Sequence, residues 1–417
     1  MTEAERHDSP GYTGRLQRGI AFQRGRRAAP CYRLLLLNAA TGATPEAIHD
    51  GVLAIDEMLQ RLAAGEVREL AGQPADRAAA SAELFAGLEH LVGFGRRLFD
   101  ADVHDPMLID APRPDYLAYL PADGPFPALR WEQDRGVNPG EADIALQFTG
   151  DRQAAVNCAA VEVWKLLMDE ALPLEPVASF DGFSRHDGRG WLEFHDGVSN
   201  IESSERHAAL EARADPPWMA GGTYMAFLRL TVDLAVWRTL SRGEQELLVG
   251  RDKLSGAALV GTRHDGSGAA IPVAAPPPGE HTDDRGLADF IDPPQTTDPL
   301  VETSHVHRAN QVRGSPAAAA ALRMFRQGYE FLEDLVGRPR LGLNFVSFQR
   351  DLAVVHHVLH LPGWLGDVNF GGPTQAGPGD PQPIRLVSVA AGGFYAVPPV
   401  GAHFPGAEIF ARERRDG

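Results

Sequence analysis

Apolar residues in the first part of the chain form two patterns, a short continuous run followed by a stretch with helical spacing. Residues 31–37 form the run, which ends in four leucines and predicts a buried strand. Thr44 and Pro45 then supply a helix-capping side chain and a proline suited to a first helical turn. The following apolar residues step by four and three positions: Ile48, Val52, Ile55, Leu59 and Leu62. This spacing predicts a helix with one buried face.

The same kinds of pattern continue to the end of the chain. We expect strands at 91–99, 144–148, 224–232, 343–348 and 394–397, and helices at 156–167, 234–248 and 352–361. The order strand, helix, strands, helix occurs once before and once after residue 220, which is typical of ferredoxin-like units. The chain is therefore predicted to be an α+β protein of duplicated ferredoxin-like units, with antiparallel sheets flanked by helices.

The composition along the chain predicts three parts. Residues 1–27 are polar and are expected to form an N-terminal arm at the surface, while 28–190 and 191–417 are expected to form the two ferredoxin-like domains. The longest stretch expected to be irregular is 262–300, which leads to His305. Loops of this length in compact domains usually carry function or are disordered.

The bulk composition narrows the classes of function. The chain has 417 residues and a formal net charge of −17, which disfavours binding to nucleic acid or to anionic membranes. Two cysteines, Cys31 and Cys158, are too few for a disulfide framework or a cysteine-held metal cluster. The sequence contains no apolar run of membrane-spanning length and no visible export signal, so we expect a cytoplasmic protein.

Three residues supply the groups that a peroxide-cleaving haem site needs. His305 offers an imidazole that can ligate iron, although a structural histidine is the alternative. Arg326 offers a permanent positive charge that would stabilise a departing hydroxide, against the alternative of a solvated arginine on a helix. Asp196 offers a carboxylate that could move a proton between the two peroxide oxygens, although Asp196-Gly197 also signals a plain turn.

Several neighbouring residues have competing interpretations. His195 precedes Asp196, but adjacent side chains in an extended segment face opposite ways, so one of the two is expected to enter the site. Asp351 is a candidate partner for the second ring nitrogen of His305. His356 and His360 have a spacing that can hold zinc, but the sequence shows neither the usual glutamate nor a third ligand.

The chain resembles the dye-decolourising peroxidases, which are haem peroxidases built from two ferredoxin-like units. Matching segments follow one another in the family's order over residues 12–400: Leu91-Val92-Gly93-Phe94-Gly95, Asp143-Ile144-Ala145-Leu146-Gln147, Phe194-His195-Asp196-Gly197-Val198-Ser199-Asn200, Gly221-Gly222-Thr223-Tyr224, Val249-Gly250-Arg251-Asp252-Lys253-Leu254-Ser255-Gly256, Ser304-His305-Val306-His307-Arg308-Ala309-Asn310, Phe325-Arg326-Gln327-Gly328-Tyr329, Phe345-Val346-Ser347-Phe348 and Gly393-Phe394-Tyr395-Ala396-Val397. Each motif alone is weak, whereas their order and spacing together are specific.

The resemblance implies a function and a role for each site residue. It implies that 191–417 binds haem b, with His305 as the proximal iron ligand, Asp196 as the distal acid/base and Arg326 as the distal charge. The co-substrates would be hydrogen peroxide and an organic electron donor such as a dye, a phenolic compound or a small metabolite. Large donors would need a surface aromatic relay, for which Trp364 and Tyr329 are candidates by residue type. A homo-oligomer is compatible with the sequence.

One position departs from the family pattern. The family's distal motif opens with glycine, and this chain has Glu193 there. Glycine commonly marks a backbone with positive φ or a close approach to a cofactor. The change leaves open a specialised haem oxidase or oxygenase acting on one biosynthetic metabolite. A haem carrier or sensor is a further alternative, but haem binding alone would require neither Asp196 nor Arg326.

Overall fold

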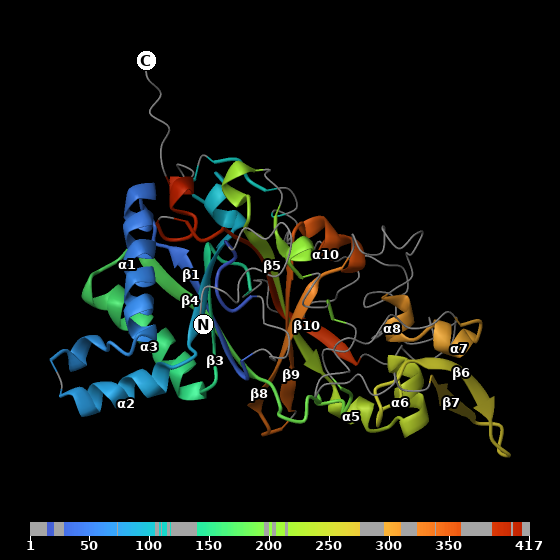
Figure 1. Ribbon diagram of the computed structural model, residues 1–417. Coiled ribbons are helices and arrows are strands. Elements are labelled where there is room, and N and C mark those ends of the chain that lie inside the picture. The colour runs from blue at the N-terminus through green and yellow to red at the C-terminus, as the bar shows by residue number, and fades with distance from the viewer. Residues whose placement is uncertain are drawn as a thin grey trace.

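A computed structural model of the chain shows a closed antiparallel barrel between two groups of helices (Figure 1). The residues that it describes are 15–20, 29–72, 74–104, 108–109, 111–114, 117, 140–195, 200–201, 206–212, 216–275, 296–309, 323–337, 339–359, 386–401 and 403–410. The strands are β1 (Cys31–Ala39), β2 (Glu89–Gly95), β3 (Ile144–Gly150), β4 (Leu174–Phe183), β5 (Thr223–Val232), β6 (Leu259–His264), β7 (Ala270–Ala274), β8 (Phe325–Asp334), β9 (Arg340–Gln349) and β10 (Val387–Val397). The helices are α1 (Pro45–Ala63), α2 (Ala75–Phe85), α3 (Gln153–Asp169), α4 (Arg206–Leu210), α5 (Leu234–Trp237), α6 (Arg242–Val249), α7 (Pro299–Glu302), α8 (His305–Arg308) and α10 (Leu352–Leu359), with short 3₁₀ turns η2 (Arg68–Leu70), η3 (Arg96–Phe99), η4 (Pro217–Met219) and η6 (Ala407–Phe410).

The barrel consists of two four-stranded units with the same internal order. Around the barrel the strands run β1-β3-β2-β10-β5-β9-β8-β4. In each unit the fourth strand pairs with the first, the first with the third and the third with the second, which is the ferredoxin-like arrangement. The prediction of a duplicated α+β fold is confirmed, and the two sheets additionally join at their edges into one barrel. The division at residue 190 stays a prediction, and it falls in the connection after β4.

The two seams between the units are short. At one seam β10 pairs with β2 through Tyr395–Gly95 and Ala396–Phe94. At the other seam β4 pairs with β8 through Phe183–Glu330. Side chains inside the barrel form one apolar core, and the helices cover a second core on its outer face.

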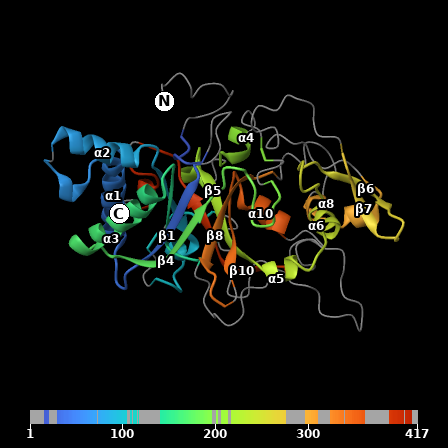
Figure 2. The same cartoon turned by 90° about the horizontal axis from the view of Figure 1, so that it is seen from below.

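The helices divide between opposite sides of the barrel. Figures 1 and 2 both show α1, α2 and α3 on one side, and α6, α7, α8 and the β6–β7 hairpin on the other. The α1 helix begins as predicted, because the Thr44 side chain accepts from the Ala47 backbone amide and Pro45 opens the helix. No described helix is long and apolar enough to span a membrane.

Three expectations about local structure were wrong. The strand expected at 91–99 ends at Gly95, and a 3₁₀ turn replaces the remainder. The helix expected at 234–248 is broken, because Ser241 and Glu244 form a capping box that starts a new helix, α6. The stretch 262–300 is not irregular throughout, since the β6–β7 hairpin occupies its beginning.

The N-terminal segment is more closely integrated than the expected surface arm. Within its described part, residues 15–20, the side chains of Leu16 and Ile20 belong to the core inside the barrel. The Gln17 side chain donates to the carbonyl groups of Val92 and Pro398 and accepts from the Val92 amide. This segment therefore helps to fill one end of the barrel.

Candidate functional site

His305 opens helix α8, which packs against the turn that ends helix α6. Gly250 terminates α6 with φ +90°, and a Cβ atom there would lie 2.3 Å from Ser304 Oγ and 2.5 Å from Val306 Cγ2. The bare backbone of Gly250 thus supports both neighbours of His305. Arg251, the next residue, is buried, and its guanidinium donates to the Gly256 carbonyl at 3.1 Å.

The environment of His305 favours a neutral imidazole. Its pKa is lowered to about 4, first by burial and then by the positive charges of Arg326 and Arg251. Part of the side chain nevertheless remains accessible. A neutral ring with accessible surface is the form of histidine that ligates iron. The shift also shows that the structure brings the charges of Arg326 and Arg251 within electrostatic reach of His305.

Arg326 is not a helix residue, since it lies on strand β8. Its neighbours Phe325 and Gln327 point into the barrel and are buried, so Arg326 projects from the outer face on the side of Ser347. Asn200 fixes the Arg326 backbone from the side: its Nδ2 donates to Arg326 O at 2.7 Å, and its Oδ1 accepts from Arg326 N at 3.0 Å. Asn200 is therefore bound directly to strand β8 at Arg326.

The outer face of the sheet near Arg326 offers apolar surface. Leu343 and Phe345 of β9 alternate with the buried Asn344 and Val346, and both remain partly accessible. Phe345 pairs with Gly328, which has no side chain to cover it. A flat apolar cofactor needs such a surface beside a ligating side chain. A neutral imidazole at His305, the charge of Arg326 and this apolar surface are the groups that would hold a haem, with His305 toward its iron.

Asp196 itself lies outside the described residues, but the segment before it is described. Residues 189–195 form a narrow hairpin in which Gly190 N donates to Phe194 O at 3.0 Å and Glu193 N to Gly190 O at 2.7 Å. The His195 ring lies with Nε2 2.8 Å from an Arg189 guanidinium nitrogen. That imidazole is thus engaged at its ε nitrogen by a residue of its own hairpin.

Glu193 has a backbone conformation that usually requires glycine. Its φ is +64°, in the left-handed region, which L side chains rarely adopt. Its exposed carboxylate lies 3.3 Å from the guanidinium of Arg185. The substitution at this motif position therefore leaves a glycine-like backbone in place and directs the added carboxylate toward Arg185.

Other candidates from the sequence have different surroundings. Asp351 is exposed, and its carboxylate accepts from the Ala353 amide at the start of α10, which gives it a helix-capping contact. Tyr329 is fully buried, so it is not a surface relay. Trp364 and His360 lie outside the described residues. His356 lies on α10, and the described part of the chain contains no group of three or more metal-binding side chains.

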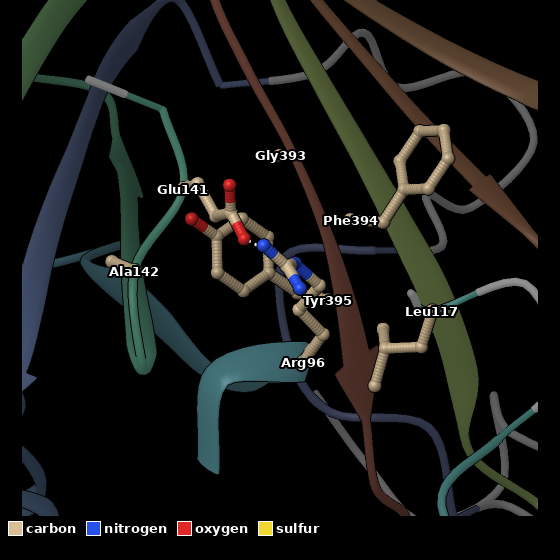
Figure 3. A pocket seen from close by; sticks show the side chains of 7 residues that line it. All are labelled: Arg96, Leu117, Glu141, Ala142, Gly393, Phe394 and Tyr395. Atoms are coloured by element: carbon tan, nitrogen blue, oxygen red, sulfur yellow. Dashed lines mark hydrogen bonds and ion pairs between the residues drawn. The ribbon is translucent and has the colours of Figure 1, made fainter. Parts of the chain in front are cut away.

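A small gap between side chains lies elsewhere in the described structure. It lies between η3, β10 and Leu117, where the Arg96 guanidinium pairs with the Glu141 carboxylate and the Tyr395 side chain contributes to the lining (Figure 3). The Tyr395 hydroxyl donates to the Gly140 carbonyl at 2.7 Å. The polar groups of Arg96, Glu141 and Tyr395 that line this gap thus bond to one another or to the backbone. The lining includes none of the predicted site residues.

Comparison with known proteins places this geometry in a family. The family model described as Dyp-type peroxidase, C-terminal, matches residues 187–401, just over half of the chain. The chain belongs to the Dyp-type peroxidase family. This confirms the resemblance inferred from the ordered motifs, and the matched region contains His305, Arg326, Asn200 and the hairpin before Asp196.

Solved structures of the family share the fold over nearly the whole chain. A DyP-type peroxidase from Cellulomonas bogoriensis matches with a TM-score of 0.65 and 20% identity, over 92% of this chain and 94% of its own. A DyP-type peroxidase from Streptomyces coelicolor matches with a TM-score of 0.60 and 20% identity, over 95% of this chain and 96% of its own. The likeness therefore includes the N-terminal unit, which lies outside the family-model match.

Sequence relatives cover less of the chain. A deferrochelatase from Shigella flexneri is 26% identical over 224 residues, which are 50% of this chain and 48% of that protein. A deferrochelatase from Escherichia coli strain K12 is 27% identical over 169 residues, which are 39% of this chain and 34% of that protein. The match thus spans about half the length of the first of these relatives and about a third of the second.

Sequence reasoning missed two arginines near the site. Arg251 stands within the long motif 249–256, but nothing in the motif indicated that its charge would reach His305. Arg189 stands outside the family motifs, and no pattern in the sequence indicated that it would contact the segment before Asp196. The charge of Arg251 acts on His305, and Arg189 also bonds to the carbonyl groups of Lys253 and Leu254, so both effects join segments that are far apart in the chain.

Proposed function

We propose that this protein is a haem peroxidase that reduces hydrogen peroxide and oxidises organic donors in one-electron steps. The main support is the convergence of three segments. The charge of Arg326 reaches His305, and Asn200, four residues after Asp196, binds the Arg326 backbone. The residues assigned to the proximal and distal sides of the site thus come from segments that meet.

Each residue has a defined task in this proposal. His305 would hold the haem iron through its neutral imidazole. Haem b would supply the redox chemistry of peroxide cleavage. Asp196 would take a proton from one peroxide oxygen and return it to the other. Arg326 would stabilise the negative charge on the departing oxygen, because a guanidinium stays protonated at every relevant pH.

Optical spectroscopy of the haem-loaded protein, followed by rapid mixing with hydrogen peroxide, tests this function. We expect a histidine-ligated Soret band that changes rapidly on mixing. His305→Ala should lose the ligated spectrum, while Asp196→Ala and Arg326→Ala should keep it and react at least about a hundred-fold more slowly. The exposed Arg263 provides a control, and Arg263→Ala should behave like the parent protein.

Two outcomes of this experiment would contradict the proposed function. A haem spectrum that peroxide does not change would favour a haem carrier or a specialised oxidase. Failure to bind haem at all, even after reconstitution, would overturn the assignment of His305.

A further inference from the structure

Arg189 connects segments from both sides of the candidate site. One terminal nitrogen of its guanidinium donates to Glu193 O and to Lys253 O, each at 2.7 Å. The other donates to Leu254 O at 3.0 Å and lies 2.8 Å from His195 Nε2. One planar group therefore joins the hairpin before Asp196 to the loop after Arg251.

The contact with His195 fixes the state of that ring. A guanidinium donates hydrogen bonds and accepts none, so Nε2 of His195 must be the acceptor. The ring proton then lies on Nδ1. His195 is consequently oriented by Arg189 at the position immediately before Asp196, and the segment is fixed on both its backbone and its side chain.

The loop at the other end of this connection is compact and continuous with the support of His305. Lys253 N donates to the Glu246 carboxylate at 3.0 Å, Asp252 N to Ala257 O at 2.8 Å, and Gly256 N to Asp252 O at 2.9 Å. The residues that precede this loop are Gly250, whose backbone lies against Ser304 and Val306, and the buried Arg251. A short, bonded path therefore leads from Arg189 to the helix that begins at His305.

We propose that Arg189 is a positioning residue that sets the spacing between the hairpin 189–195, which leads into Asp196, and the loop 252–255 next to the support of His305. This proposal rests on the proposed peroxidase function. The spacing matters because a proton acceptor misplaced by about 1 Å loses much of its effect on rate. Lysine cannot replace Arg189, since a single ammonium group lacks the planar fork that serves both segments at once.

A double-variant comparison in the haem-loaded full chain distinguishes positioning from general stabilisation. We expect Arg189→Ala to slow the reaction with hydrogen peroxide by about a hundred-fold, approaching Asp196→Ala. Arg189→Ala added to Asp196→Ala should slow it no further, because Arg189 acts through Asp196. Equal losses in both backgrounds, or an unchanged rate in Arg189→Ala, would overturn the proposal.

Two further variants sharpen this comparison. Arg185 lies just before this hairpin, and its guanidinium contacts the carboxylates of Asp187 and Glu193 rather than backbone groups. Arg185→Ala should therefore react at close to the parent rate. Arg189→Lys should be slowed nearly as much as Arg189→Ala, and it replaces that variant if the alanine form does not accumulate.

Hydrogen exchange in the haem-free protein separates failure of this proposal from failure of the peroxidase function. Arg189→Ala should increase amide exchange in both 193–195 and 252–255, whereas Arg185→Ala should leave 252–255 unchanged. If the parent protein did not react with peroxide, the function would fail, but exchange would still report whether Arg189 holds the two segments. Unchanged exchange in Arg189→Ala would refute the connection itself.

Discussion

The surroundings of single residues determine which protonation states the site can adopt. Because the pKa of His305 is lowered to about 4, the haem-free folded protein should bind no proton there between about pH 6.5 and pH 4, whereas the unfolded chain should. The contribution of His305 to stability is therefore fully present above the unfolded pKa and is lost as the pH falls through this interval.

Titration of His305 by NMR in the haem-free protein measures this state directly. We expect a midpoint near pH 4, and we expect Arg251→Gln to raise it, because the substitution removes one of the two positive charges that oppose protonation. Arg238→Gln is a control at an exposed arginine. A midpoint near 6.5 in the parent protein would contradict the burial of the ring.

Substitutions at Glu193 measure how much stability is lost when a residue with a side chain adopts a left-handed backbone conformation. Ala171 has the same type of conformation, with φ +48°, and lies at an exposed turn. Ala171→Gly should raise the free energy of unfolding by about 1 kcal/mol. Glu193→Gly should give a smaller gain, because it also removes the contact with Arg185, an exposed ion pair worth less than about 1 kcal/mol. Chemical denaturation of both variants measures the difference, and a loss of stability in Ala171→Gly would contradict this account.

At the scale of elements, the ends of helices were harder to predict than their faces. The buried face of α1 follows directly from its apolar spacing, and its start follows from Thr44 and Pro45. The break between α5 and α6 is encoded by Ser241 and Glu244, but the apolar residues on both sides keep a helical spacing that hides it. Local capping thus overrode a periodic pattern that would otherwise predict one helix.

The residues of the candidate site that belong to sequence motifs could be predicted. Those that reach the site through tertiary contacts could not. His305 and Arg326 were predicted from residue type and motif order, and the structure brings the charge of Arg326 within electrostatic reach of His305. That Arg326 lies on a strand did not follow from its flanking residues. The contacts of Asn200 and Arg189 depend on segments that meet only in the fold, so the spacing of residues in the sequence gives no signal for them.

The junction of α6 and α8 depends on a glycine that lacks space for any side chain. Gly250→Ala should destabilise the protein by about 3 kcal/mol and weaken haem binding, because the new Cβ would displace Ser304 and Val306 on either side of His305. Gly268 has a similar φ of +87° with nothing within 4 Å of the added atom. Gly268→Ala should therefore cost only about 1 kcal/mol and leave haem binding unchanged. Equal haem affinity in the two variants would show that this junction does not position His305.

For the whole molecule, the barrel depends on buried polar contacts near its shorter seam. Arg229 of β5 is buried, lies over the Phe331 ring at 3.5 Å, and donates to Asn344 Oδ1 and to the Glu333 carboxylate, each at 2.6 Å. Asn344 of β9 in turn donates to the Asp181 carbonyl of β4 at 2.8 Å. This path joins β5, β9 and β4 close to the point where β4 pairs with β8.

Substitutions along this path should separate the cost of a buried charge from the value of its contacts. Asn344→Leu leaves the Arg229 guanidinium short of an acceptor and Asp181 O without its donor, so we expect a loss of about 3 kcal/mol. Glu333→Gln should cost less than about 1 kcal/mol, because Glu333 is partly exposed and water can replace it. Adding Arg229→Met to Asn344→Leu should recover part of the loss, since it removes the buried charge together with its need for a partner. Chemical denaturation measures all three, and a double variant less stable than Asn344→Leu alone would show that Arg229 holds the barrel through Phe331 and Glu333 rather than through Asn344.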